Sequence, residues 1–424
     1  MTHSISLIRH SFFKRGAGIL GLCIGLATLS LTLVSYHALA AEKGQQISRA
    51  IAKEMSAAQK ALQSSQWAEA LKNLEVAATK SDLTTFDKKT IYDFKGFAYT
   101  RLGNYKSAQQ AYEQALATGA YSAEDTAKTE RILFRMTAGS QQYSKAIEYG
   151  KKVTESGAAN ADDYAIMGQS YYLTKDCKNA AVWVDKSIAS TRRAGEAPKE
   201  ALYQIKLRCA FDANDTPSTI AALEELIKLT GKTEYWNQLI RFQRQDERDD
   251  HNLLMIYRVM YNTNAMTEGN DYMEMAQLLG DAALPGEAQA VIEKASASGV
   301  FKDAQKDRTN RLLNSTKTRA DADRKGLKQL EAEASKNAAG ELDVKLGEVY
   351  YGFGDYQNTV TAINRALQKG QIKHLDEAYV YLGLAQVALK NNSEAKKAFV
   401  ELKKVPKMSP RVLKLWELYA DKLG

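Results

Sequence analysis

Hydrophobic and small residues recur along this chain at helical spacing, and the same pattern returns every 34 to 39 residues. Two strings show it most clearly: "YTRLGNYKSAQQAYEQAL" (99–116) and "YYGFGDYQNTVTAINRAL" (350–367). In both, a Gly-Asn-Tyr or Gly-Asp-Tyr triplet is followed by a small or β-branched residue, then by a large residue, and then by Ala-Leu. The sequence has no sustained alternation of apolar and polar residues, which would indicate β-strands. The pattern therefore predicts an all-α protein.

The tyrosine of this triplet marks each repeat, and equivalents can be placed along the whole chain. They are Trp67, Tyr105, Tyr143, Cys177, Thr216, Asp250, Pro285, Asp321, Tyr356 and Asn392. A period in the mid-thirties indicates two-helix hairpins stacked in series, with the marker at the start of the second helix. A small residue stands nine positions before the marker in the clearest repeats, at Gly96, Gly168, Gly347 and Gly383. We expect it to let the two helices approach closely, while the large residue seven after the marker, such as Tyr112 or Ile363, packs on the adjoining repeat.

The two glycines of the second string have different predicted roles. Gly354 is expected to end the first helix, with Asp355 capping the start of the second. Gly352 is expected to lie on the exposed inner face, where the absence of a side chain is tolerated.

These residues, in helix-turn-helix order, resemble the tetratricopeptide repeat (TPR) over roughly residues 47 to 408. The resemblance implies a right-handed α-solenoid of about ten repeats, whose first helices line a concave groove. The predicted organisation is a signal peptide or signal anchor (1–40), about seven repeats (41–300), a degenerate charged helical repeat (301–339), two clear repeats (340–408) and a capping helix (409–424). The final helix should bury Val412, Leu415, Trp416, Tyr419 and Leu423, since the last repeat of an array needs a cover.

The whole chain is also similar to exported proteobacterial TPR proteins, through strings such as "KTEYWNQLIR" (232–241) and "GQIKHLDEAYVYLGLA" (370–385). Members of that group are sometimes encoded beside components of TonB-type systems. The resemblance implies a role in the cell envelope.

The first forty residues have the composition of a secretory leader. "MTHSISLIRHSFFKR" holds three basic residues and no acid, residues 16–34 are apolar, and Ala38 and Ala40 provide an A-x-A site. Cleavage after Ala40 is expected. The alternative is an uncleaved signal anchor, since nineteen uncharged residues can cross a hydrocarbon core about 30 Å thick. Both interpretations predict a periplasmic protein, with membrane contact only in the second.

Cys177 and Cys209 remain after the leader. A disulfide between them is one interpretation in an oxidising compartment, and two separate buried thiols are the favoured one. The same part of the chain has 55 basic and 50 acidic residues, a net charge of +5. This mild excess gives no support for nucleic-acid binding.

Candidate catalytic or metal-binding residues are few. His251 and His374 lie in different repeats with no acid or cysteine at ligand spacing, so a catalytic or metal role is disfavoured for both. The acidic pairs at 162–163 and 249–250 are expected to be solvated helix caps. The sequence has no zinc signature and no nucleophile elbow, so we expect no enzyme, cofactor, metal or small-molecule substrate.

What remains is the surface of the predicted groove. Residues expected to face it are Arg131, Arg135, Gln169, Tyr172, Gln204, Arg208, Phe211, Gln238 and Phe242. Arginine and aromatic residues commonly anchor interfaces, and guanidinium groups bind carboxylates. The leading hypothesis is a non-enzymatic periplasmic adaptor that binds a peptide or helix of another envelope protein, with the arginines steering acidic ligands. The alternative is a structural or self-assembling envelope scaffold.

Overall fold

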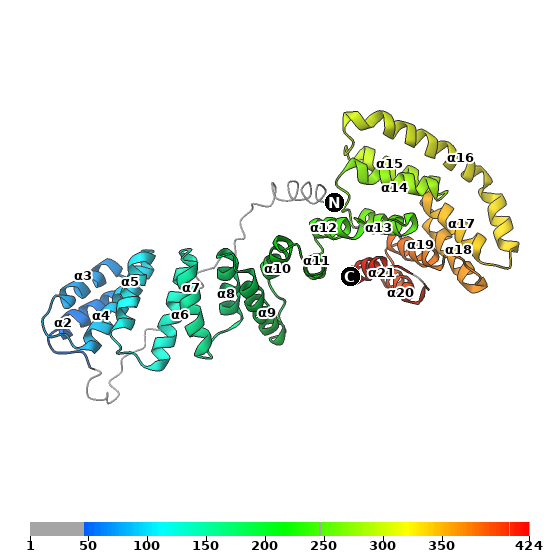
Figure 1. Ribbon diagram of the computed structural model, residues 1–424. Helices are drawn as coiled ribbons and strands as arrows, with labels where there is room; N and C mark the ends of the chain where they lie inside the picture. The colour runs from blue at the N-terminus through cyan, green and yellow to red at the C-terminus, as the bar shows by residue number, and fades with distance from the viewer. Residues whose placement is uncertain (1–45, 246, 407, 424) are drawn as a thin grey trace. The chain divides into compact units, whose positions relative to one another are not determined.

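The computed structural model describes residues 46–245, 247–406 and 408–423, and this part of the chain forms helices and no β-strand (Figure 1). The chain divides after Asn214 into two compact units, which we call the N-terminal and C-terminal units. The N-terminal unit contains α2 (Ala52–Gln63), α3 (Trp67–Ala78), α4 (Thr85–Arg101), α5 (Tyr105–Ala117), α6 (Ala123–Gly139), α7 (Tyr143–Glu155), α8 (Ala161–Leu173), α9 (Cys177–Arg193) and α10 (Glu200–Asp212).

The C-terminal unit has one helix much longer than the rest. Its helices are α11 (Thr216–Thr230), α12 (Thr233–Arg244), α13 (Asp250–Asn262), α14 (Gly269–Asp281), α15 (Pro285–Ala297), η1 (Asp303–Gln305), α16 (Lys306–Lys336), α17 (Glu341–Gly352), α18 (Tyr356–Lys369), α19 (Leu375–Ala388), α20 (Asn392–Glu401), η2 (Leu402–Lys404) and α21 (Pro410–Asp421). None of the described helices is long and apolar enough to cross a membrane. The predicted leader lies outside the described residues.

The repeat markers are confirmed at nine of their ten positions, where the marker is the first residue of a helix. The marker at Asp321 is wrong. It lies inside α16, a continuous helix of 31 residues, and no helix begins there. The prediction of that marker rested on repeat spacing alone, because no glycine or asparagine directly before Asp321 provides a turn.

The glycines of the first helices make room for the large residue of the same repeat. A Cβ added at Gly96 would lie 2.8 Å from the Tyr112 ring, and one at Gly347 would lie 2.6 Å from the Ile363 side chain. Such separations are too short for carbon atoms, so any larger residue would push the two helices apart. Tyr112 also packs against Leu133 of the next hairpin, as the spacing predicted.

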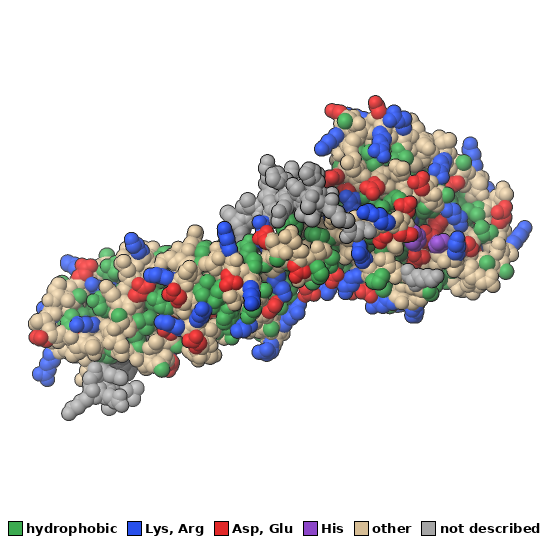
Figure 2. Space-filling model, in the orientation of Figure 1, with side chains coloured by type: hydrophobic (Ala, Val, Ile, Leu, Met, Phe, Trp, Pro, Cys, Tyr) green, Lys and Arg blue, Asp and Glu red, His purple; other side chains and the backbone are tan. Residues whose placement is uncertain are grey.

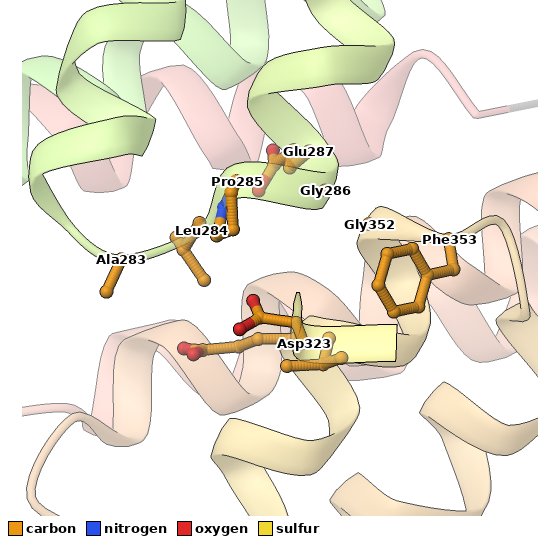
Figure 3. Close-up of a pocket in the computed structure, with 10 residues that line it drawn as sticks. Ala283, Leu284, Pro285, Gly286, Glu287, Asp323, Gly352 and Phe353 are labelled. Carbon is orange, nitrogen blue, oxygen red and sulfur yellow. The ribbon is translucent and has the colours of Figure 1, made fainter. Parts of the chain in front are cut away.

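The turn at Gly354 is confirmed, whereas the prediction for Gly352 is wrong. Gly354 has φ +76°, a conformation that favours glycine, and the Asp355 side chain accepts a hydrogen bond from the Asn358 amide. Gly352 does not face an open groove. A Cβ there would lie 2.7 Å from the backbone nitrogen of Glu287, because the end of α17 meets the start of α15 at Gly286 (Figure 3).

The two units differ in how their helices pack. In the N-terminal unit, each helix packs chiefly on its neighbours in the chain. In the C-terminal unit, α21 packs on α11 and α13 as well as on α20, and α15 packs on α17. The last helix of this unit therefore meets its first helices, and the unit closes on itself.

The final helix buries most of the residues predicted for it. Val412, Leu415, Trp416 and Tyr419 are buried, whereas Leu423 lies beyond the end of α21 and is half-buried. On the molecular surface, charged, polar and apolar side chains are mixed over both units, as Figure 2 shows.

Candidate functional site

The predicted groove residues are divided between the two units. Arg131 and Arg135 lie on α6, Gln169 and Tyr172 on α8, Gln204, Arg208 and Phe211 on α10, and Gln238 and Phe242 on α12 of the C-terminal unit. All nine side chains are half-buried. We call the seven on α6, α8 and α10 the first-helix strip. Its role in binding remains a prediction.

Arg131 and Arg135 both bind a carboxylate of the next hairpin. Arg135 Nη2 lies 2.9 Å from Asp163 Oδ1, and Arg131 Nη2 lies 3.0 Å from Asp163 Oδ2. Asp163 is fully buried at the third position of α8, where it also accepts a hydrogen bond from the amide of Asn160. The expectation of a solvated cap is therefore wrong for Asp163, although Asp162 is exposed. The two arginines first of all hold α6 against α8.

The same arrangement recurs in the C-terminal unit. Asp271, at the third position of α14, is buried, and its Oδ1 lies 3.0 Å from Nη1 of Arg244 on α12. Burial raises the pKa of the Asp271 carboxyl, while Arg244 and Arg241 oppose that rise. A buried aspartate near a helix start, bound by arginines of the preceding first helix, is thus a structural element of these repeats. The sequence did not predict this element, although the position of the aspartates is visible in it.

Two buried polar atoms of the first-helix strip lack a hydrogen-bond partner among the described residues. They are Nε of Arg131 and the side-chain carbonyl oxygen of Gln169. A buried polar atom without a partner destabilises a protein by about 1–3 kcal/mol. After a side-chain rotation, Nε of Arg131 could donate a hydrogen bond to the backbone of a bound peptide. The side-chain oxygen of Gln169 could accept one from the same backbone. On α10, Arg208 Nε lies 3.1 Å from Asp212 Oδ2.

The interior of the C-terminal unit is filled by its own side chains. Arg258 of α13 is fully buried, and its Nε and Nη2 donate to the two carboxylate oxygens of Glu287 at 3.2 and 3.1 Å. Arg258 also donates to the hydroxyl of Tyr381, which in turn donates to Glu287 Oε2 at 2.7 Å. Burial acts to lower the pKa of Arg258, but Glu287, Tyr381 and Glu377 together outweigh it and hold the pKa above its ordinary value. This network joins α13, α15 and α19.

Glu348 of α17 lies beside this network and is also buried. Burial and, to a smaller extent, the charge of Glu377 raise its pKa to about 8, although Lys345 opposes both. The Lys345 Nζ lies 3.2 Å from Glu348 Oε2. The C-terminal unit therefore contains a carboxyl group whose charge changes near neutral pH.

His251 and His374 belong to different repeats, yet they lie side by side. His251 is in the first turn of α13 and His374 directly precedes α19, and their ring centroids are 5.5 Å apart. His251 Nε2 lies 2.5 Å from Asp376 Oδ2, a hydrogen bond that raises the pKa of His251. The sequence shows no paired acid at ligand spacing, but closure of the C-terminal unit brings α13 onto α19 and Asp376 to His251. Figure 2 shows both histidines at the surface, beside acidic side chains.

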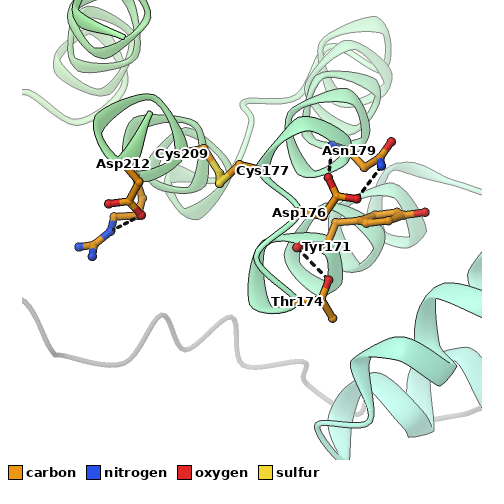
Figure 4. The surroundings of a disulfide bond; sticks show 8 residues. Tyr171, Thr174, Asp176, Cys177, Asn179, Cys209 and Asp212 are labelled. Atoms are coloured by element: carbon orange, nitrogen blue, oxygen red, sulfur yellow. Dashed lines mark hydrogen bonds and ion pairs between the residues drawn. A yellow bond between two sulfur atoms is a disulfide. The ribbon is translucent and has the colours of Figure 1, made fainter. Parts of the chain in front are cut away.

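Cys177 and Cys209 form a disulfide that joins the start of α9 to α10, with Cα atoms 5.4 Å apart (Figure 4). The favoured interpretation of two separate thiols is therefore wrong. The first repeat marker without an aromatic residue is Cys177, and its sulfur bonds to Cys209 of the following hairpin. Asp176, beside it, caps α9 by accepting from the Asn179 amide.

Two pockets among the described residues lie apart from the first-helix strip. A polar pocket of about 340 Å³ lies between α8, α9 and the loop before α10, and its lining includes Asp162, Ser190 and Lys199. The gap between α15 and α17 in Figure 3 has a volume of only about 10 Å³. This small gap between α15 and α17 has room for about one water molecule.

Comparison with known proteins finds solved helical repeat structures of low sequence identity. No protein-family model matches the chain, and no curated protein matches it. The solved complex of Naa15 and Naa10 bound to HypK-THB aligns with 85% of this chain at 13% identity, with a TM-score of 0.37. This chain spans 64% of the length of that protein.

Two further similar structures are tetratricopeptide repeat proteins. One, from Parabacteroides merdae ATCC 43184, aligns with 78% of this chain and 98% of its own length at 9% identity, with a TM-score of 0.30. The other, the C-terminal part of a TPR repeat-containing protein from Cytophaga hutchinsonii, aligns with 84% and 97% at 12% identity, with a TM-score of 0.31. At such values the similarity concerns the fold alone. The description of this chain as stacked helical hairpins rests on its own helices.

Proposed function

We propose that this protein is a non-enzymatic adaptor that binds an extended segment or a helix of another protein on the first-helix strip of its N-terminal unit. The observation that carries the proposal is the contrast between the units. The interior of the C-terminal unit is filled by Arg258, Tyr381 and their neighbours, whereas α6, α8 and α10 carry a row of half-buried polar and aromatic side chains. Because these side chains are already partly exposed, they can contact a partner while the protein stays folded.

The ion pairs of the strip change the expected role of its arginines. Because Asp163 already neutralises part of the charge of Arg131 and Arg135, electrostatic steering of an acidic ligand is weaker than their sequence positions imply. Hydrogen bonds to the partner backbone and contact with Tyr172 then provide most of the affinity. We place the partner among proteins and peptides, with no role for nucleic acid.

We further propose that the protein acts in the periplasm, in association with another envelope protein. The basic-apolar-small order of residues 1–40 and the disulfide between Cys177 and Cys209 support this location, since disulfides persist in oxidising compartments. A TonB-type system is the setting that the similarity of the sequence to exported TPR proteins suggests.

Site-specific photo-crosslinking tests the binding face. A photoreactive amino acid replaces Tyr172 in one protein and, as a matched control, the exposed Tyr105 at the start of α5 in another. We expect a crosslinked partner at position 172 and none at 105. The partner, once identified and purified, should then bind the Gln169→Ala, Tyr172→Ala double variant at least about 10-fold more weakly than the Tyr105→Ala variant.

Two results would contradict this proposal. Equal binding by the two variants would place the partner on another surface. Crosslinks only between copies of this chain, together with concentration-dependent sedimentation, would instead support a self-assembling scaffold.

A further inference from the structure

We propose that the C-terminal unit binds one divalent transition metal ion, with zinc the best match, through His251, His374 and Asp376. Each residue offers one ligand atom, and these atoms all lie within 4.8 Å of one another. All three residues are partly exposed, so an ion can enter from solvent. This inference is independent of the proposed adaptor function.

The geometry needs only small side-chain movements to hold an ion. Ligand atoms bound to zinc at 2.0–2.1 Å in a tetrahedron are about 3.3 Å apart. His251 Nε2 and Asp376 Oδ2 are 2.5 Å apart, with a proton between them. A metal ion in the place of that proton would move the two atoms apart by less than about 1 Å. His374 would complete the set, because its ring makes no hydrogen bond to another described residue.

The second ring nitrogen of His251 already has the partner expected of a metal ligand. Its Nδ1 lies 3.5 Å from Glu377 Oε1. A histidine that binds metal through one nitrogen usually donates its other N–H to a carboxylate or carbonyl, which fixes the ring orientation. Glu377 would therefore orient His251, while Asp376 binds the ion. The two acids are adjacent in the first turn of α19, and their charge attracts a cation.

Two imidazoles and one carboxylate define the class of metal. Imidazole is a preferred ligand of zinc, copper, nickel and iron, whereas calcium and magnesium prefer oxygen ligands alone. Three protein ligands leave a fourth tetrahedral position for water or for a side chain of another molecule. Because the ligands come from α13 and from the start of α19, the ion would also join helices that are distant in sequence.

Isothermal titration of the chelator-treated, tag-free chain with zinc chloride at pH 7.5 tests the proposal. We expect one high-affinity site per chain. His374→Ala should weaken binding by more than about 100-fold, and Glu377→Gln by about 10–100-fold. His374→Ala is the decisive variant because it breaks no hydrogen bond of the fold, and circular dichroism would check its helix content. Cobalt should give the visible absorption of a four-coordinate ion in the wild type and not in His374→Ala.

Asp250→Asn is the matched control, since Asp250 is exposed beside His251 and is not among the three ligands. It should bind zinc like the wild type. The proposal is overturned if the wild type binds no zinc, if His374→Ala binds as tightly as the wild type, or if Asp250→Asn loses as much affinity as His374→Ala. The last result would mean that the acidic surface attracts cations without a defined site.

Discussion

The N-terminal and C-terminal units are built from the same kind of helical hairpin, yet one stays open and the other closes. In the N-terminal unit the contacts run chiefly between neighbours in the chain, with fewer between first helices of successive hairpins such as α6 and α8. In the C-terminal unit, Arg258 reaches Tyr381 and His251 reaches Asp376, across more than 120 residues. The same local rule for forming hairpins therefore produces an open stack in one unit and a closed arrangement in the other.

The long helix α16 explains much of the difference. The repeat spacing predicts a first and a second helix over this stretch, but the chain forms the single helix α16. The regular alternation of first and second helices is therefore interrupted here. The second helix α15 then packs on the first helix α17, and the two meet at Gly286 and Gly352, where neither residue has a side chain. In Figure 1, α16 runs from the end of α15 to the start of α17.

The largest effect is expected from breaking the buried network of the C-terminal unit. Arg258→Ala leaves Glu287 buried without its cation, which should lower the free energy of unfolding of this unit by roughly 3–5 kcal/mol. Hydrogen exchange measured by mass spectrometry should accelerate in α13, α15 and α19. Exchange in α2 to α10 should not change, because the N-terminal unit has no part in this network.

Two further variants show whether charge or packing is responsible. Lys397→Ala removes an exposed ion pair with Glu394 and should change stability by less than about 1 kcal/mol. Combining Arg258→Met with Glu287→Leu removes both charges and should recover most of the loss. If Arg258→Ala behaves like Lys397→Ala, the network does not hold the unit closed.

Removing the disulfide should destabilise the N-terminal unit and leave the C-terminal unit unchanged. The bond closes a loop across a sequence separation of 32 residues, and changing both Cys177 and Cys209 to serine should destabilise the N-terminal unit by roughly 4 kcal/mol. Hydrogen exchange should then accelerate in α9 and α10 and stay unchanged in α13 to α21. A reductant should bring the wild type to the level of the double variant and leave the variant unaffected. Insensitivity of the wild type to reductant would contradict this prediction.

The hairpins could be predicted because their signals are local. A Gly-Asn/Asp-Tyr turn, a capping side chain and a small residue at fixed spacing lie within one repeat, and nine markers begin helices. The prediction that a helix begins at Asp321 was wrong, because this position has the repeat spacing but no turn residue before it. Gly352 failed because its contact is with the backbone of α15, more than 60 residues away, which leaves no trace in the residues around it.

The candidate sites could be predicted only in part, for the same reason. The positions of Arg131 and Arg135 on a first helix follow from helical spacing, but their shared partner Asp163 belongs to the next hairpin. His251 and His374 have no local metal motif, since closure alone brings them together. The sequence therefore predicts the faces of individual helices better than it predicts which faces meet.

The smallest effect concerns pH and again separates the two units. The folded protein keeps the proton of Glu348 up to a pH of about 8, because burial raises the pKa of this carboxyl, whereas the unfolded chain releases it near the ordinary pKa of 4.5. Stability of the C-terminal unit should therefore fall as pH rises between these values, by roughly 2 kcal/mol from pH 6 to pH 8. Glu348→Gln removes this dependence, so its urea midpoint should rise relative to the wild type over that range. The exposed Glu394→Gln variant should track the wild type at every pH, and a constant difference between wild type and Glu348→Gln would show that the carboxyl is already charged at pH 6.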